Sequence, residues 1–294
     1  MFRELEQALE WIQSLNLDCS QSRFLKYRDE LKLAEGKLSL PPSFHREAYD
    51  TAAEASDLIF IHLGLARIQS PSFVKKLKVV LEGPKHAVDE KTDGSSHKPR
   101  NTAFELVIAA HFALAGFEVS FDSEADVVVS DEKSAFYVEC KRPSGTDIAG
   151  TIDDIHRQLR RRYRTHQLEK AARGLGILCI TKKILPDSET LLVNTAQEGY
   201  DAAMGVLKRA HDDTEKMWYK NLHHQTMAGL IYLNMPIALI GRHGLIISRA
   251  FSGRYVSRTH KTNLADGDPD RIYFNQIVSL LNTSASAALS QTER

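Results

Sequence analysis

Three charged side chains, Asp126, Glu139 and Lys141, lie in two β-rich segments whose spacing could bring them together. The segments 125–130 and 135–141 are separated by only four residues, which predicts a β-hairpin. With an even-numbered loop, Asp126 would lie directly opposite Glu139, and Lys141 would project from the same face two residues further on. Carboxylates opposed in this way destabilise a sheet unless their charge is compensated, and a divalent cation would compensate it.

The chemistry that such a site could support is cation-assisted attack of water on a phosphodiester. We expect Asp126 and Glu139 to bind Mg²⁺ or Mn²⁺, because Mg²⁺ takes oxygen ligands, typically one or two carboxylates completed by water and substrate phosphate. Lys141 would act as a general base, for which its pKa must fall by about 3 pH units. Alternatively, Lys141 would stay charged and stabilise the negative charge of the transition state. The sequence leaves both roles open.

A third acid, Glu105, is predicted to join this site from a helix. Residues 101–115 are apolar on nearly every side, which predicts a buried helix that Gly116 ends. Glu105 is the only acid in this segment, and buried acids are seldom left unpaired. We expect a metal contact for Glu105, direct or through water, and a salt bridge, for example to Arg100, is the alternative.

A basic helix is predicted to follow the hairpin, over residues 151–172. Gln158 borders its apolar stripe and could therefore reach the metal site. The stretch 155–173 holds seven Lys or Arg residues and one acid, which favours a phosphate-binding surface over a merely solvated face. The arginines expected to contact nucleic acid are Arg142, which follows Lys141, and Arg157, Arg160, Arg161, Arg162 and Arg164.

The elements that must position these residues are predicted to form two domains. Residues 1–82 show helical periodicity and predict an N-terminal α-helical domain, whereas 83–100 is rich in Gly, Pro, Ser and charge and predicts a linker or exposed loop. Residues 101–282 combine helices and strands, including an apolar strand at 175–181 of the kind buried on both faces of a sheet. The Ser/Ala-rich segment 283–294 predicts a disordered tail.

The order of these residues resembles the PD-(D/E)xK nuclease superfamily over about residues 100–181. Glu105 matches the helix acid of that superfamily, Asp126 the first strand acid, Glu139 and Lys141 the E-x-K pair, and Gln158 the polar residue of the next helix. The resemblance implies an α/β fold with a restriction-endonuclease-like core, in which helices flank a central mixed sheet. It also implies an Mg²⁺-dependent endonuclease that hydrolyses phosphodiester bonds, most often in DNA.

Two features depart from the superfamily pattern. Ala125 stands where a proline precedes the aspartate, but that proline is not a ligand. Gln158 and Tyr163 are one residue further apart than in the Q-x3-Y pattern of the RecB-like branch, so that branch is not assigned. The alternative is a catalytically inactive nuclease-fold module that binds nucleic acid or a protein partner, although such a scaffold has no need of opposed acids.

Composition limits the setting in which this chemistry would take place. The chain has 38 basic and 38 acidic residues, and this zero net charge is compatible with nucleic-acid binding because the basic residues are concentrated at 155–173. No apolar run approaches the roughly 18 residues of a membrane helix, so no membrane partner is expected. Three widely spaced cysteines and a charged N-terminus indicate a cytoplasmic protein.

The sequence is compatible with a homodimer, or with a partner protein bound through the N-terminal helices. Restriction, repair and antiviral defence all fit, and the last is favoured by the superfamily's association with bacterial systems.

Overall fold

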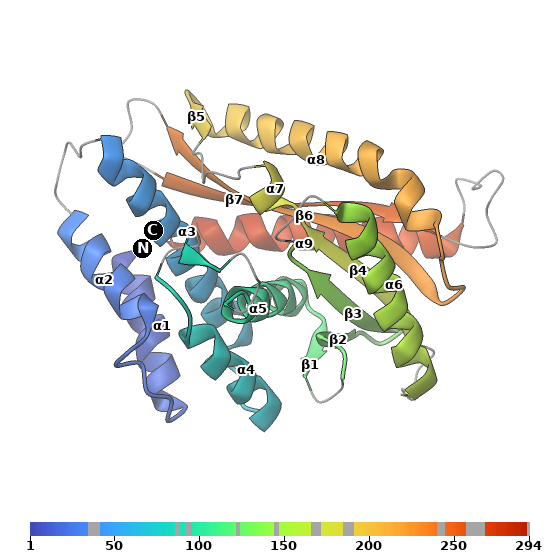
Figure 1. The fold of residues 1–294 in the computed structure, drawn as a ribbon, viewed down its shortest axis with the longest axis horizontal. Helices are drawn as coiled ribbons and strands as arrows, with labels where there is room; N and C mark the ends of the chain where they lie inside the picture. Colours follow the sequence, from blue (N-terminus) through green and yellow to red (C-terminus); the bar gives the residue numbers. More distant parts are fainter. Residues whose placement is uncertain are drawn as a thin grey trace.

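The structure is a computed structural model that describes residues 1–34, 42–85, 89–91, 96–121, 124–143, 147–165, 172–184, 191–239, 245–256 and 268–292. Within these residues, helices lie on both faces of one mixed β-sheet, which confirms the predicted α/β class (Figure 1). None of the helices in this described part of the chain combines the length and the apolar character needed to cross a membrane.

Five helices form the N-terminal part of the fold and pack on one face of the sheet. They are α1 (Phe2–Ser14), α2 (Arg23–Ala34), α3 (Pro42–Leu65), α4 (Pro71–Leu81) and α5 (Lys98–Leu114). Helix α5 contacts both α3 and α4 and is buried along most of its length, as its apolar composition predicts (Figure 1). Gly116, at a φ of 92°, takes a left-handed conformation just after this helix ends. Residues of α1–α5 share a single hydrophobic core with this face of the sheet.

In the described part of the chain, the sheet has seven strands and mixes parallel with antiparallel pairing. The strands are β1 (Glu118–Ser120), β2 (Val127–Ser130), β3 (Ala135–Lys141), β4 (Ala172–Cys179), β5 (Leu191–Val193), β6 (Thr226–Leu239) and β7 (Leu245–Tyr255). Their order is β1-β2-β3-β4-β6-β5, and β7 also pairs with β6. The β1–β2, β2–β3 and β6–β7 pairs are antiparallel, whereas β3–β4, β4–β6 and β5–β6 are parallel.

The hairpin of β2 and β3 has the register that the sequence predicts. Val127 pairs with Val138 and Val129 pairs with Phe136. In the turn, the carboxylate of Asp131 accepts hydrogen bonds at 2.8 Å from the backbone N–H groups of the second and third residues after it. One face of the hairpin contributes to the core shared with α1–α5, through Val127, Val129, Phe136, Val138 and Cys140. The other face contributes Val128 and Tyr137 to a second core.

The remaining helices are α6 (Ile148–Thr165), α7 (Thr181–Ile184), α8 (Ala196–Tyr219) and α9 (Pro269–Thr292). Helices α6 and α8 cover the second face of the sheet (Figure 1). Trp218 of α8 packs directly on the backbones of β4 and β6, because Gly176 and Gly229 leave room for its ring. A Cβ atom at these glycines would lie 2.9 Å and 2.3 Å from that ring.

Several elements extend beyond their predicted bounds. Helix α5 begins at Lys98, inside the segment 83–100 predicted as a linker, and α9 continues to Thr292, into the segment predicted as a tail. The sequence predicts separate strands at 230–233 and 237–240, but β6 is continuous through Pro236, which pairs with Ile247. Proline removes one backbone donor without breaking the extended conformation, so the strand continues. The turn predicted at 241–244 lies outside the described residues.

Candidate active site

The acids predicted for the site converge where β3 ends. Asp126 immediately precedes β2, and its Oδ2 atom accepts a hydrogen bond from the backbone N–H of Cys140 at 2.8 Å. Its side chain therefore reaches across the hairpin beside Glu139, as the predicted register requires. The carboxylate of Asp126 acts electrostatically on both Glu105 and Glu139, so the α5 acid lies near the hairpin acids.

Glu139 is the most strongly constrained of these acids, because its side chain has no exposed surface. Its pKa is raised from 4.5 to about 7, first by burial and then by the neighbouring carboxylate of Asp126. The pKa of Glu105 is raised to about 7 by the same two causes. An ionised carboxylate in such a buried position lowers the stability of the folded protein.

Arg162 of α6 is the counter-ion of Glu139. Its Nε atom donates to Oε1 of Glu139 at 2.8 Å, and its Nη1 atom donates to Oε2 of Glu124 at 3.0 Å. The second carboxylate oxygen of Glu139, Oε2, is buried and has no hydrogen-bond partner among the described residues. The carboxylate is thus held by one oxygen, and the other oxygen is buried without a donor.

Glu105 has a salt bridge, as the alternative reading of the sequence proposes, but its partner is not Arg100. Lys76 of α4 lies 2.5 Å from Oε2 of Glu105. Arg100 instead pairs with Glu54 of α3 at 2.7 Å.

Lys141 is held by two side chains of α6. Its Nζ atom donates to Oε1 of Gln158 at 3.0 Å and lies 3.4 Å from Oδ2 of Asp154. Nε2 of Gln158 donates to the same Asp154 oxygen at 2.9 Å, so the three side chains form a closed triangle. The structure therefore places Gln158 in contact with Lys141, whereas Asp154 is absent from the sequence prediction. The spacing of Asp154 and Gln158, four residues apart on one helix face, is the signal that could have identified it.

The arginines predicted to bind nucleic acid have different surroundings. Arg157, Arg161 and Arg164 are exposed on α6, whereas Arg162 is buried. Arg160 is half-buried and bonds the carbonyl of His156, and Arg157 pairs with Asp154. Arg142 lies 3.3 Å from a carboxylate oxygen of the buried Glu90. The exposed part of the predicted phosphate-binding surface is therefore the outer face of α6.

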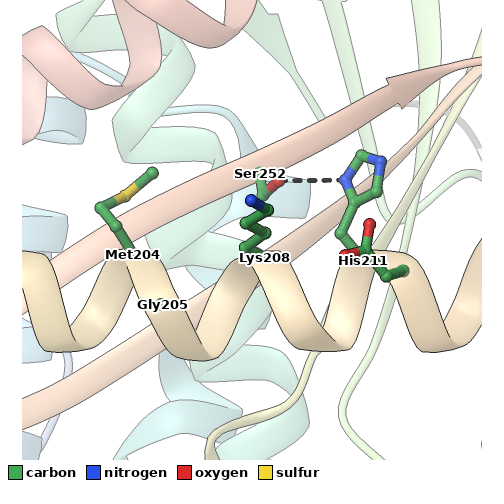
Figure 2. Close-up of a pocket in the computed structure, with 6 residues that line it drawn as sticks. Met204, Gly205, Lys208, His211 and Ser252 are labelled. Carbon is green, nitrogen blue, oxygen red and sulfur yellow. Dashed lines mark hydrogen bonds between the residues drawn. The ribbon is translucent and has the colours of Figure 1, made fainter.

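A pocket elsewhere in the structure lies between α8 and β7 (Figure 2). It has a volume of about 490 Å³ and is lined by Met204, Gly205, Lys208, His211, Asp212 and Ser252. Figure 2 shows the hydrogen bond in it between Nδ1 of His211 and the Ser252 hydroxyl, at 3.0 Å. None of the predicted site residues lines this pocket.

Protein side chains alone do not form a complete metal cage in the described part of the chain. No group of three or more His, Cys, Asp or Glu residues there is arranged to hold a metal ion. Mg²⁺ sites that act on phosphates usually need only one or two carboxylates, because water and substrate supply the other ligands. Asp126 and Glu139, with the unpartnered oxygen of Glu139, fit that requirement.

Comparisons of the chain with protein-family models, with curated proteins and with solved structures give no significant match.

Proposed function

We propose that this protein is a divalent-cation-dependent nuclease that hydrolyses phosphodiester bonds, with DNA as its expected substrate. The observation that carries the proposal is the buried Glu139 beside Asp126, with one carboxylate oxygen that has no donor among the described residues. A buried acid with a raised pKa is costly, and perturbed acids cluster at functional sites. The sheet flanked by helices is compatible with the restriction-endonuclease-like core that the resemblance to PD-(D/E)xK nucleases implies.

In this proposal, Asp126 and Glu139 hold Mg²⁺ or Mn²⁺, and Glu105 contacts it directly or through water. When bound, such a cation polarises the phosphate, lowers the pKa of water and neutralises charge on the leaving oxygen. Arg162 fixes the Glu139 carboxylate through Oε1, and Oε2 has no hydrogen-bond partner among the described residues.

Lys141 is oriented by its contacts with Gln158 and Asp154. An amide oxygen and a carboxylate are acceptors that suit an ammonium group, and this favours the charge-stabilising role over the role of base. The exposed arginines of α6, Arg157, Arg161 and Arg164, would contact the phosphate backbone next to this site.

The proposal is tested by a cleavage panel of plasmid, linear duplex DNA, single-stranded DNA and RNA, each with Mg²⁺, Mn²⁺ or EDTA. We expect cleavage with a cation and none with EDTA. Lys141→Met should slow cleavage by about a thousandfold, because it removes the charge that stabilises the transition state. The exposed acid Glu132 lies in the hairpin turn, so Glu132→Gln is the matched control that should cleave normally.

Two results would contradict the proposal. The first is that no substrate in the panel is cut with either cation. The second is that Lys141→Met and Asp126→Asn both cleave as fast as the wild-type protein while circular dichroism shows intact folds. Binding without cleavage would instead indicate the inactive nuclease-fold module. A cytoplasmic setting, a role in antiviral defence, and a homodimer or partner protein on the N-terminal helices stay predictions.

A further inference from the structure

We propose that Arg161 and Arg162 form a phosphate-binding subsite, and that the carboxylate of Glu124 occupies it in the free protein until a substrate phosphate displaces it. This inference rests on the proposed nuclease function and specifies how the substrate backbone is held beside the catalytic acids. It gives Glu124 the role of an internal competitor, which occupies these two arginines in place of a substrate phosphate.

The geometry of the three side chains supports the subsite. Nη1 of Arg162 donates to Oε2 of Glu124 at 3.0 Å, and Nη2 of Arg161 lies 3.6 Å from the same oxygen. A carboxylate and a phosphate present similar planar pairs of oxygen acceptors to a guanidinium group, which binds either of them in a bidentate manner. A position where two guanidinium groups meet one carboxylate oxygen is therefore also a position for a phosphate.

Exposure decides which of these contacts can be exchanged. The side chain of Glu124 is 51% exposed and that of Arg161 is 69% exposed. Exposed ion pairs contribute little to stability, so Glu124 can leave at small cost. Arg162 is only 10% exposed and is anchored by the fully buried Glu139 at 2.8 Å, so it stays in place when Glu124 leaves.

The subsite lies next to the proposed reaction centre. Arg162 contacts Glu139 and Glu124 at the same time, so one guanidinium group separates the Glu124 carboxylate from the catalytic acid. Glu124 also stands only two residues before Asp126. A phosphate at the Glu124 position would thus belong to a nucleotide near the scissile bond, and Arg162 would link substrate binding to the position of Glu139.

The test is the affinity of Glu124→Gln for a short fluorescent duplex DNA, measured by anisotropy in EDTA so that cleavage does not interfere. We expect binding about three- to tenfold tighter than for wild type at low salt, because the arginines no longer have an internal acid to release. Glu132→Gln removes one exposed acid from the hairpin turn and is the matched control for net charge, with little expected change.

Dependence on Arg161 separates the subsite from a general charge effect. Glu124→Gln introduced into an Arg161→Gln protein should give a smaller gain than in the wild-type protein, because only Arg162 is then released. The inference is overturned if Glu124→Gln binds no more tightly than Glu132→Gln, or if the gain is as large without Arg161. In either case a wild-type protein that still cleaves DNA with Mg²⁺ would keep the proposed function, whereas a wild-type protein that neither binds nor cleaves any nucleic acid would remove both.

Discussion

Replacing the buried acid Glu139 by glutamine is expected to stabilise the metal-free protein at alkaline pH. The carboxylate is fully buried, and its pKa is raised from 4.5 to about 7 by burial and by Asp126. The folded protein therefore keeps a proton on Glu139 that the unfolded chain releases between about pH 4.5 and about pH 7. Stability falls as the pH rises through this window, since ionising the buried acid becomes part of the cost of folding.

The size of the effect follows from the pKa. A rise from 4.5 to about 7 corresponds to about 3 kcal/mol, at about 1.4 kcal/mol for each pH unit. Glutamine does not ionise, and its amide oxygen keeps the hydrogen bond from Arg162. Its amide nitrogen takes the place of Oε2, which has no hydrogen-bond partner among the described residues. The variant should therefore gain about 2 to 3 kcal/mol at about pH 8 and almost nothing at about pH 5.

The assay is urea unfolding of both proteins in EDTA at about pH 5 and at about pH 8, followed by circular dichroism. Added Mn²⁺ should raise the unfolding midpoint of the wild-type protein more than that of the variant, because only the wild type has both carboxylate ligands. The reasoning is refuted if the variant is less stable than wild type at about pH 8, or if the difference is the same at both pH values.

Three further predictions test other contacts. Asp154→Asn should slow cleavage about tenfold, because Lys141 loses its carboxylate partner, whereas Asp153→Asn on the same helix should cleave normally. Glu54→Ala should lower the unfolding free energy by about 3 kcal/mol in urea, since two buried arginines lose their shared acid; a loss below about 1 kcal/mol would contradict this. Gly229→Ala should lower the unfolding free energy by about 2 kcal/mol, seen as a lower thermal midpoint, because its Cβ would lie 2.3 Å from the Trp218 ring. Gly205→Ala, where the nearest atom is 4.0 Å away, is the control that should not be destabilised.

The hairpin and its register could be predicted because they follow from local rules. Alternation of apolar residues defines the two faces, and an even-numbered loop allows one register that buries Val127 and Val138 together. The buried α5 helix is also a local signal, since its composition is apolar on every side. Partners across the fold could not be predicted in the same way. Lys76 lies on α4, a helix that ends well before Glu105 in the sequence, and the hydrophobic periodicity of the sequence does not predict their contact.

The sequence does contain a signal for the burial of Arg162. This residue continues the apolar periodicity of α6, although its charge suggests a surface position. Ile152, Ile155 and Leu159 follow one another at three- and four-residue intervals, and Arg162 continues that series on the same face of α6. An arginine on the apolar face of an amphipathic helix must be buried with an acid, and the opposed strand offers Glu139. A count of basic residues treats this arginine as surface charge, although it belongs to the interior.

This distinction changes the expected strength of nucleic-acid binding. Of the basic residues in 155–173, Arg162 is buried, Arg173 pairs with Asp270 at 2.7 Å, and Lys170 lies outside the described residues. The exposed arginines in this stretch of the described chain are Arg157, Arg161 and Arg164. With one phosphate for each, the logarithm of the DNA association constant should fall with the logarithm of salt concentration with a slope of about −3. A measured slope near −5, as the net charge of the whole stretch would give, would show that the phosphate-binding surface extends well beyond the outer face of α6.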